Sequence, residues 1–408
     1  MVLQRSKVIT PCVILTEGAI GQSVGMIRSI GRRGIPVYLL IVPWDAKSAS
    51  ILGKSRYCKA VHTISATSNA NEVCENALMW LKKQHFPVKP VLIPINDKLC
   101  TYVAQCRARF SEKFDVCMAS NDVVLGMLDK KKAHLLVKGS GLTVPETFSA
   151  TSLAELESVV HKCGFPVIVK PLWWRERGKR NFKAERCDTQ AQLFDVGGQL
   201  IENGATLLVQ AYIPGDDDTF EVYMFYRTRD GHTIHGCTGQ KLRQIPPSVG
   251  NMASGRATVL SHVTEMSNML LKHIDYRGLG GIEYKRNGQT RYFIEMSVRP
   301  EGFHMLAMKA GIDLPWLAYS DMIRSHTDHR PNAQRDACYI NIRSYISLWN
   351  KYRSEVPVFR EMLKVLFIRR IQFDLWSWRD PMPWLLATKG WLNDLLTRTK
   401  TTLFRNAK

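Results

Sequence analysis

The chain has 408 residues and no run of about eighteen apolar residues, so no segment is expected to span a bilayer. The first residues lack a secretory signal pattern, because the apolar stretch after them is short and is broken by Pro11. The ten cysteines include no CxxC pair and show no metal-ligand spacing with histidine. That pattern favours reduced thiols over a disulfide framework, and we expect a cytoplasmic protein.

Several signatures of catalysis and binding are also missing. The chain has no GxSxG sequence and no legible Ser–His–Asp arrangement, which disfavours covalent nucleophilic catalysis. Gly18, Gly21 and Gly25 do not form GxGxxG, so they favour a tight strand-to-helix turn over a dinucleotide site. Zinc-finger spacing, RNP-like aromatic motifs and heptad arrays are absent as well, and we expect no nucleic-acid binding.

Acidic residues are scarce relative to basic ones. The 56 Lys and Arg against 36 Asp and Glu give a net charge of +20. Such a balance attracts anionic partners, and binding ATP alone does not require it. Hydrophobic residues make up 45% of the chain, enough for sizeable cores, and the length predicts two to three domains.

Two glutamates on neighbouring predicted strands are the most informative feature that is present. Between Glu283 and Glu295 lies Asn287-Gly288, and this dipeptide flanked by alternating residues predicts a β-hairpin. Directly opposed on such a hairpin, the two carboxylates would lie about 5 Å apart. Like charges that close repel unless a cation separates them, and Mg²⁺ prefers carboxylates together with nucleotide phosphate oxygens. The pair therefore indicates a metal–nucleotide site; a solvated surface hairpin is the alternative.

The segments upstream suit a bound polyphosphate. An apolar strand that begins at Phe165 ends in Lys170, which can act as a point charge against phosphate. The cationic loop 172–180 follows and is expected to close as a lid. The strand 207–213 can pair its backbone with an adenine edge, and the acids at 216–218 can bond ribose hydroxyls.

This order of motifs, over about residues 8 to 325, resembles the ATP-grasp superfamily. It is most similar to the carboxylate–amine ligase branch, which includes D-alanine–D-alanine ligase and D-aspartate ligase. The resemblance implies ATP and Mg²⁺ (or Mn²⁺) as cofactors. It places Lys130, Lys170 and Lys241 at ATP phosphates, Gln210, Ala211 and Ile213 at adenine, Asp217 at ribose, Glu283 and Glu295 at the metal, and Arg299 at transferred phosphate or substrate carboxylate.

One position departs from the family pattern. The second metal strand usually reads Glu-x-Asn, and this chain reads Glu295-Met296-Ser297. A serine hydroxyl can ligate a hard cation, although it is shorter than an asparagine carbonyl. Two alternatives stay open: Ser297 is the third ligand, or water replaces it with a weaker second metal.

The expected fold class is α/β. The strand–helix–strand pattern at 8–42 predicts a Rossmann-like N-terminal domain over residues 1–125. A two-lobed ATP-grasp domain of α+β type is expected over 126–325, and a basic helical region over 326–408. Asp97, just after a strand, is interpreted as a helix N-cap rather than a substrate contact, and His304 as a surface residue or a core residue rather than a substrate contact.

The C-terminal region carries a net charge of +9 from Arg324 on, and four of the ten tryptophans, Trp376, Trp378, Trp384 and Trp391, fall near its end. We interpret it first as helices that pack on the core with a solvated basic face. The alternative is an amphipathic surface that meets anionic lipid or a lipid-linked acidic substrate.

The chemistry implied by these motifs is ATP-dependent ligation. A carboxylate has a poor leaving group until ATP converts it to an acyl-phosphate, from which an amine then displaces phosphate. The expected substrates are a small carboxylate and an amine, such as an amino acid or a cell-wall precursor. Two other classes remain: a nucleotide-binding protein without ligase activity, and a basic module that binds membranes or acidic polymers.

Overall fold

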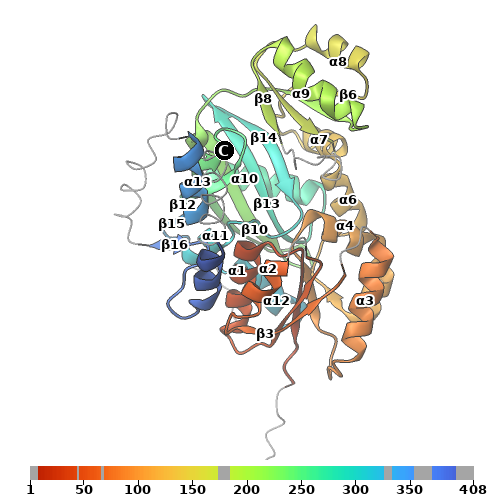
Figure 1. Cartoon of the computed structure of the whole chain (residues 1–408), viewed down its shortest axis with the longest axis vertical. Coiled ribbons are helices and arrows are strands. Elements are labelled where there is room, and N and C mark those ends of the chain that lie inside the picture. The colour runs from red at the N-terminus through yellow and green to blue at the C-terminus, as the bar shows by residue number, and fades with distance from the viewer. Residues whose placement is uncertain are drawn as a thin grey trace, which may run out of the picture.

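Three β-sheets and the helices packed on them form the described part of the chain (Figure 1). The structure is a computed structural model that describes residues 8–43, 46–65, 69–172, 184–325, 333–352 and 370–391. The α/β class expected from the sequence is confirmed. No helix among the described residues is both long and apolar enough to cross a membrane.

The N-terminal sheet is parallel and has the strand order β3-β2-β1-β4-β5. Its strands are β1 (Cys12–Thr16), β2 (Val37–Ile41), β3 (Cys58–Thr63), β4 (Val91–Pro94) and β5 (Asp115–Val116). Its helices are α1 (Ile20–Gly31), α2 (Ala46–Leu52), α3 (Ala70–Lys82), α4 (Asp97–Gln105) and α5 (Arg107–Lys113). The strand order reverses between β1 and β4, and ligands of open α/β sheets bind at the carboxyl ends of such strands. The expected Rossmann-like arrangement is therefore present.

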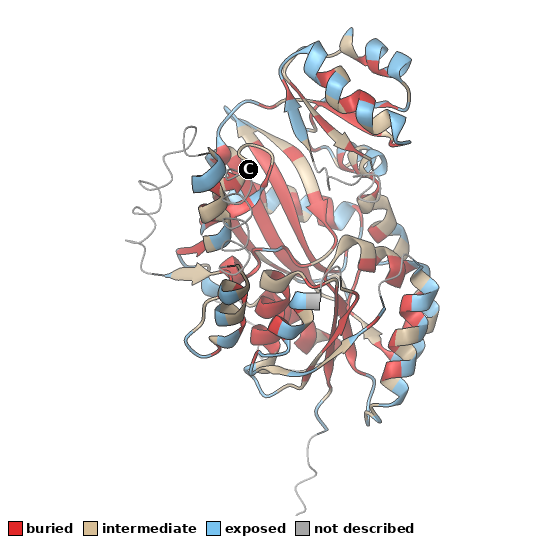
Figure 2. Ribbon diagram, viewed as in Figure 1, coloured by how far each residue is buried: buried red, intermediate tan, exposed pale blue. Residues whose placement is uncertain are grey.

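A small four-stranded lobe follows two linking helices, α6 (Asn121–Leu128) and α7 (Lys130–Gly139). Its antiparallel strands are β6 (Thr147–Ala150), β7 (Val167–Pro171), β8 (Glu185–Cys187) and β9 (Leu207–Ala211), covered by α8 (Leu153–Val160) and α9 (Gln190–Glu202). Helix α8 begins at a cap: the Ser152 hydroxyl accepts from the Glu155 N–H at 3.2 Å, and the Glu155 carboxylate accepts from the Thr151 N–H at 2.7 Å. The lobe encloses its own apolar core and presents exposed outer helix faces (Figure 2).

The third sheet is the largest and runs β14-β13-β10-β11-β12-β15-β16. Its first five strands in the chain are β10 (Phe220–Arg227), β11 (Ile234–Ile245), β12 (Asn251–Ala257), β13 (Gly278–Asn287) and β14 (Thr290–Ser297). The helices in this part are the 3-10 turn η2 (Asp217–Thr219), α10 (Ser261–His273), α11 (Met305–Lys309) and α12 (Leu314–Met322). Every residue of β10 is buried, because the sheet is covered on both faces.

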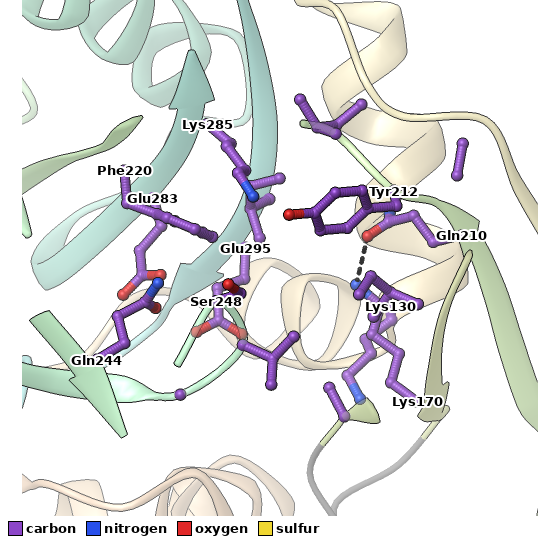
Figure 3. A pocket seen from close by; sticks show the side chains of 17 residues that line it. Lys130, Lys170, Gln210, Tyr212, Phe220, Gln244, Ser248, Glu283, Lys285 and Glu295 are labelled. Carbon is purple, nitrogen blue, oxygen red and sulfur yellow. Dashed lines mark hydrogen bonds between the residues drawn. The ribbon is translucent and has the colours of Figure 1, made fainter. Parts of the chain in front are cut away.

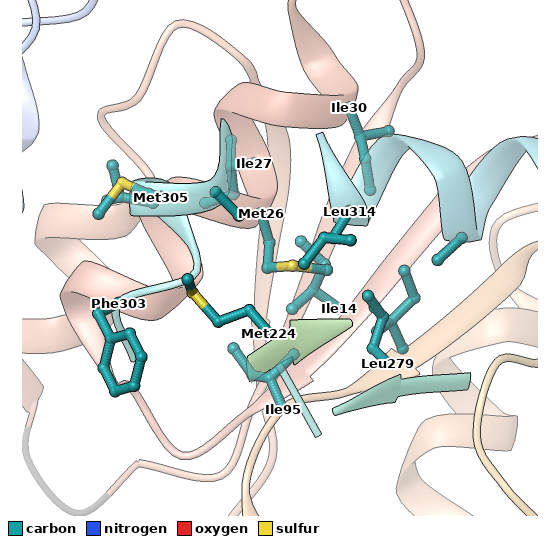
Figure 4. Close-up of a cluster of buried hydrophobic side chains, with 14 of the residues drawn as sticks. Ile14, Met26, Ile27, Ile30, Ile95, Met224, Leu279, Phe303, Met305 and Leu314 are labelled. Atoms are coloured by element: carbon teal, nitrogen blue, oxygen red, sulfur yellow. The ribbon is translucent and has the colours of Figure 1, made fainter. Parts of the chain in front are cut away.

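One apolar core joins the large sheet to the N-terminal domain. Ile14 of β1 and Met26 of α1 belong to the same buried cluster as Met224 of β10, Leu279 of β13 and Leu314 of α12 (Figure 4). Because this cluster is continuous across the two sheets, the N-terminal sheet is packed directly against the large sheet.

The expectation of a purely helical region after residue 325 is wrong. Strands β15 (Ala337–Ile340) and β16 (Ile371–Phe373) extend the large sheet through β12, and α13 (Ile342–Tyr352) packs beside them. Residues 382–391 are helical, as expected. Residues 359–370 are apolar and basic in sequence, and only Arg370 of them belongs to the described residues.

Candidate active site

The two glutamates face each other across the predicted hairpin. Glu283 of β13 is the direct register partner of Glu295 of β14, and the strands are joined by a turn with Gly288 at φ +59°. Both line one cavity, and Glu283 is only 6% exposed. A solvated surface hairpin is therefore excluded, and the predicted juxtaposition of the two carboxylates is confirmed.

Cationic side chains from α7 and from the small lobe lie on the other side of this cavity (Figure 3). Lys130 is the first residue of α7, where Asp129 caps the helix by accepting from the backbone N–H groups of Lys131 and Lys132. The Lys130 ammonium donates to the Pro171 carbonyl. Lys170 of β7 donates to the Gln210 side-chain carbonyl at 3.1 Å. The structure thus brings Lys130 and Lys170, two of the three lysines predicted to bind phosphate, to the same cavity as the glutamates, and their contact with phosphate stays a prediction.

An apolar pocket continues from these lysines. Its walls include Ile168, Ala211, Ile213, Phe220 and Ile294. The Ala211 N–H donates to the Glu146 carbonyl at 2.8 Å, so that donor is already used inside the small lobe. Three residues that were predicted to lie at adenine, Gln210, Ala211 and Ile213, all line this pocket. Their contact with a base stays a prediction.

Lys285 also lines this pocket and was missed in the sequence. It is 3% exposed, and its ammonium lies 4.5 Å from the ring centre of Tyr212 and 4.8 Å from that of Phe220. Burial lowers the pKa of Lys285 to about 8, and the nearby Asp217 carboxylate opposes that shift. Strand alternation could have predicted this position, because Lys285 is two residues after Glu283 on β13 and therefore faces the same side of the sheet.

Asp217, the predicted ribose contact, is hydrogen-bonded within the protein. It is buried, and it is not among the residues that line the cavity. Its carboxylate accepts from the Gln244 N–H at 2.9 Å, from the Gln244 side-chain amide at 3.0 Å and from the Ser248 N–H at 2.8 Å. Asp217 therefore holds the end of β11 and the loop after it, which form one wall of the cavity, and its contact with a ribose stays a prediction.

Lys241 is buried next to the metal hairpin. Its ammonium lies 2.7 Å from the Glu283 carboxylate and 3.0 Å from the Gln244 side-chain carbonyl. The side chain is 2% exposed, so the ion pair is almost fully removed from water. Lys241 therefore neutralises Glu283 in this structure, and the phosphate contact expected of it stays a prediction.

Arg299 lies in an adjoining cavity that shares Lys130, Lys170 and Glu295 with the first. Its guanidinium binds Asp97, with Nε 2.6 Å from Oδ1. Asp97 is the first residue of α4, and Asn96 occupies the N-cap position, so the N-cap interpretation of Asp97 is wrong. The pair joins the carboxyl end of β4 to the strand that carries Glu295.

Known proteins resemble this chain in sequence and in structure. No family model matches the chain. D-aspartate ligase of Enterococcus faecium (strain Aus0004) is 21% identical over 297 residues, which cover 68% of this chain and 70% of that protein. L-amino acid ligase from Bacillus licheniformis superposes with a TM-score of 0.63 at 13% identity, covering 82% of this chain and 80% of the other.

Two nucleotide-bound structures are also similar. The biotin carboxylase domain of Hydrogenobacter thermophilus 2-oxoglutarate carboxylase, in complex with MgADP, has a TM-score of 0.62 at 16% identity and coverages of 80% and 72%. N5-carboxyaminoimidazole synthetase from Staphylococcus aureus, complexed with ADP, has a TM-score of 0.58 at 16% identity and coverages of 77% and 79%. The chain has the ATP-grasp fold.

The residues of this ATP-grasp chain fit a hard divalent cation. The described residues contain no cluster of three or more His, Cys, Asp and Glu side chains that could hold a metal. The site instead offers the opposed Glu283 and Glu295 carboxylates, with the Ser297 hydroxyl on the same strand as Glu295. Magnesium commonly takes one or two carboxylates and completes its shell with phosphate oxygens and water, so this donor set suits it.

Glu301 is a third carboxyl group at this wall, and sequence reasoning missed it. Burial raises the pKa of Glu301 to about 7; Arg299 opposes that shift, and Glu283 and Glu295 reinforce it. The influence of the two hairpin glutamates shows a concentration of negative charge that a bound cation would relieve. His304, three residues on, is 2% exposed and bonds the Glu301 carbonyl through Nδ1 at 2.7 Å, which agrees with its interpretation as a core residue.

Proposed function

We propose that this protein is an ATP- and Mg²⁺-dependent carboxylate–amine ligase that forms an amide or peptide bond through an acyl-phosphate. The observation that carries the proposal is the opposed Glu283–Glu295 pair across a cavity from Lys130 and Lys170. The likeness to D-aspartate ligase and to an L-amino acid ligase supports an amino acid as one substrate.

The two sides of the cavity have complementary tasks toward a nucleotide. Lys130 and Lys170 place positive charge where the polyphosphate would lie, and the apolar pocket beyond them would take the base. Glu283, Glu295 and Ser297 would hold the divalent ion. When bound, that ion neutralises phosphate charge and makes the γ-phosphorus more electrophilic.

Arg299, oriented by Asp97, is assigned to the transferred phosphate or the substrate carboxylate. Its oxygen attacks the γ-phosphorus of ATP, the bond to the bridging oxygen breaks, and ADP leaves. The amine then attacks the acyl carbon, phosphate leaves with the bonding electrons, and the ammonium proton passes to solvent. Arg299 stabilises the anionic groups, and the Asp97 carboxylate, 2.6 Å from its Nε, fixes the guanidinium plane in this position.

A second function, nucleotide binding without ligation, is favoured by Ser297 and by the Lys241–Glu283 ion pair. A serine in place of the family asparagine shortens one ligand. The buried lysine, 2.7 Å from Glu283, competes with a metal for that carboxylate.

An ADP-release assay with panels of amino acids separates the two. The ligase predicts ADP formation that depends on a carboxylate substrate, is stimulated by an amine, and is matched by a condensed product in mass spectrometry. Tight binding of ATP without ADP release, across all amino acids and di-acids tried, would favour the binding-only function.

A further inference from the structure

Three tryptophans form a cluster at the surface after β16. The Trp376 ring packs edge-on against Trp378 and Trp384, with ring centres 4.8 and 4.7 Å apart. Trp378 is 85% exposed, the highest value among the exposed large hydrophobic side chains of the described residues. Met382 and Leu385, on the helix that follows, are 43% and 45% exposed. Apolar exposure concentrated in one short segment marks an interaction surface.

A buried polar network anchors the turn that carries Trp378. The Asp380 carboxylate, 1% exposed, accepts from Arg28 Nε at 2.9 Å, from the Ser55 hydroxyl at 2.7 Å and from the Arg56 N–H at 3.0 Å. Arg28 belongs to α1, so the turn is fixed to the N-terminal domain. The exposure of Trp378 is therefore a property of a well-anchored turn, and its ring is held outward before any partner arrives.

The charges around the cluster have one sign. Within residues 370–391 both acids, Asp374 and Asp380, are buried, whereas Arg370, Arg379 and Lys389 are exposed. The adjacent loop adds three exposed cations, namely Lys54, Arg56 and Lys59, and the sequence from 46 to 71 has no Asp or Glu. The Arg56 guanidinium reaches the Arg379 carbonyl at 3.4 Å, so the loop and the cluster are in contact.

We propose that this surface, made of Trp376, Trp378, Met382, Trp384 and Leu385 with Arg56, Arg379 and Lys389 at its edge, docks on an anionic lipid bilayer. Indole rings partition to the headgroup level of membranes, because they are apolar with one polar N–H. Basic side chains beside them pair with anionic headgroups and add affinity that falls with salt. The exposed charges in the described segments 370–391 and 54–59 are all positive, which fits an anionic membrane better than a neutral apolar partner.

The position of this lipid-docking surface is compatible with a working site. In Figure 1 the dark-blue helix at 382–391 lies beside α1 and well away from the small lobe with α8 and α9. A docked molecule would therefore keep the small lobe free of the bilayer. The docking needs no nucleotide and is independent of the proposed ligase activity.

Vesicle co-sedimentation of the full chain tests the proposal. We expect binding to vesicles of phosphatidylcholine with phosphatidylglycerol, weaker binding at high salt, and at least roughly tenfold weaker binding to phosphatidylcholine alone. Trp378→Ala should lower the partition coefficient roughly tenfold. Arg379→Glu should lower it by a similar factor on anionic vesicles only. The matched control is Met79→Ala, 57% exposed on α3, which should bind as wild type does.

Several results would overturn the proposal. Wild-type protein that does not sediment with anionic vesicles contradicts it, as do Trp378→Ala and Arg379→Glu variants that bind as wild type does. Light scattering supplies the second check: a wild-type dimer that both substitutions dissociate would assign the surface to a second copy of the chain. Circular dichroism confirms folding, which the exposed positions of both side chains are expected to leave intact.

Discussion

The acidic wall of the cavity belongs to a seven-stranded sheet, whereas the cationic wall belongs to a four-stranded lobe with a core of its own. The first eight residues of β13 are all buried, and Glu283 is among them. Along β7, buried residues alternate with half-buried ones, and Lys170 is half-buried. The β13 side of the wall that would hold the metal is thus removed from water, whereas Glu295 on β14 and Lys170 in the wall that would hold the phosphates are partly exposed. Fixed charges in a water-poor wall act more strongly on a reaction than solvated ones.

The largest effect is expected at the acidic wall. Glu295→Gln removes one metal-binding charge, and we expect turnover to fall about 10³-fold. The free energy of unfolding should change by about 1 kcal/mol or less, because Glu295 is half-buried and a repulsion is relieved. Steady-state ADP release and chemical unfolding measure the two. Glu185→Gln, an exposed glutamate on β8, is the control, and equal activity of the two variants would refute the metal role.

Lys241 tests how far the stability of the acidic wall depends on neutralisation of the buried Glu283 carboxylate. Lys241→Met leaves the Glu283 carboxylate buried without its cation, and the free energy of unfolding should fall by about 3 kcal/mol. The double variant Lys241→Met/Glu283→Gln should recover most of that loss while it stays inactive. Urea unfolding of the three proteins measures both changes. A double variant as unstable as the single one would show that the ion pair is not the cause.

The cationic wall should be the less sensitive of the two. Lys170→Met removes a phosphate-facing charge that is half-exposed to solvent, and kcat/KM for ATP should fall about 10²-fold with little loss of stability. Lys170→Arg should retain part of the activity, because the charge remains. The exposed Lys162, on the same lobe, supplies the control Lys162→Met. A loss as large as that of Glu295→Gln would contradict the difference between the walls.

Asp217 should affect stability more than nucleotide binding. Asp217→Asn weakens three hydrogen bonds to the loop 244–250, and we expect a loss of about 2 kcal/mol in the free energy of unfolding. The KM for ATP should rise by less than about threefold, because the carboxylate does not line the cavity. A large rise in the KM for ATP with unchanged stability would instead support the predicted contact between Asp217 and the ribose.

The sequence predicts local features of this fold well. The hairpin with Glu283 and Glu295 is legible because the Asn287-Gly288 turn and the strand alternation both act within about twenty residues. Strands β15 and β16 were missed because they have four and three residues, and β12, with which β15 pairs, lies some eighty residues earlier in the chain, whereas β16 joins the sheet only through β15. Short strands of this kind are specified by long-range pairing rather than by their own periodicity.

In the candidate site too, the sequence predicts local features better than long-range contacts. Lys130, Lys170 and Gln210, which the family pattern assigned to ATP, all line the cavity. Each lies in a helix or strand that the local sequence makes recognisable. The Arg299–Asp97 pair joins residues 202 positions apart, and the role of Asp217 depends on a loop 27 residues away. Neither contact has a local signal. Of the predicted lid, 172–180, only Leu172 belongs to the described residues.

The direct test of the metal site is the amount of Mn²⁺ bound by the protein in equilibrium dialysis with a saturating non-hydrolysable ATP analogue. Wild-type protein should bind Mn²⁺ in a nucleotide-dependent manner, and the Glu283→Gln/Glu295→Gln variant should bind it at least about tenfold more weakly while its apolar pocket still takes the analogue. Equal Mn²⁺ binding by both proteins would contradict the assignment of the two opposed glutamates as the metal ligands.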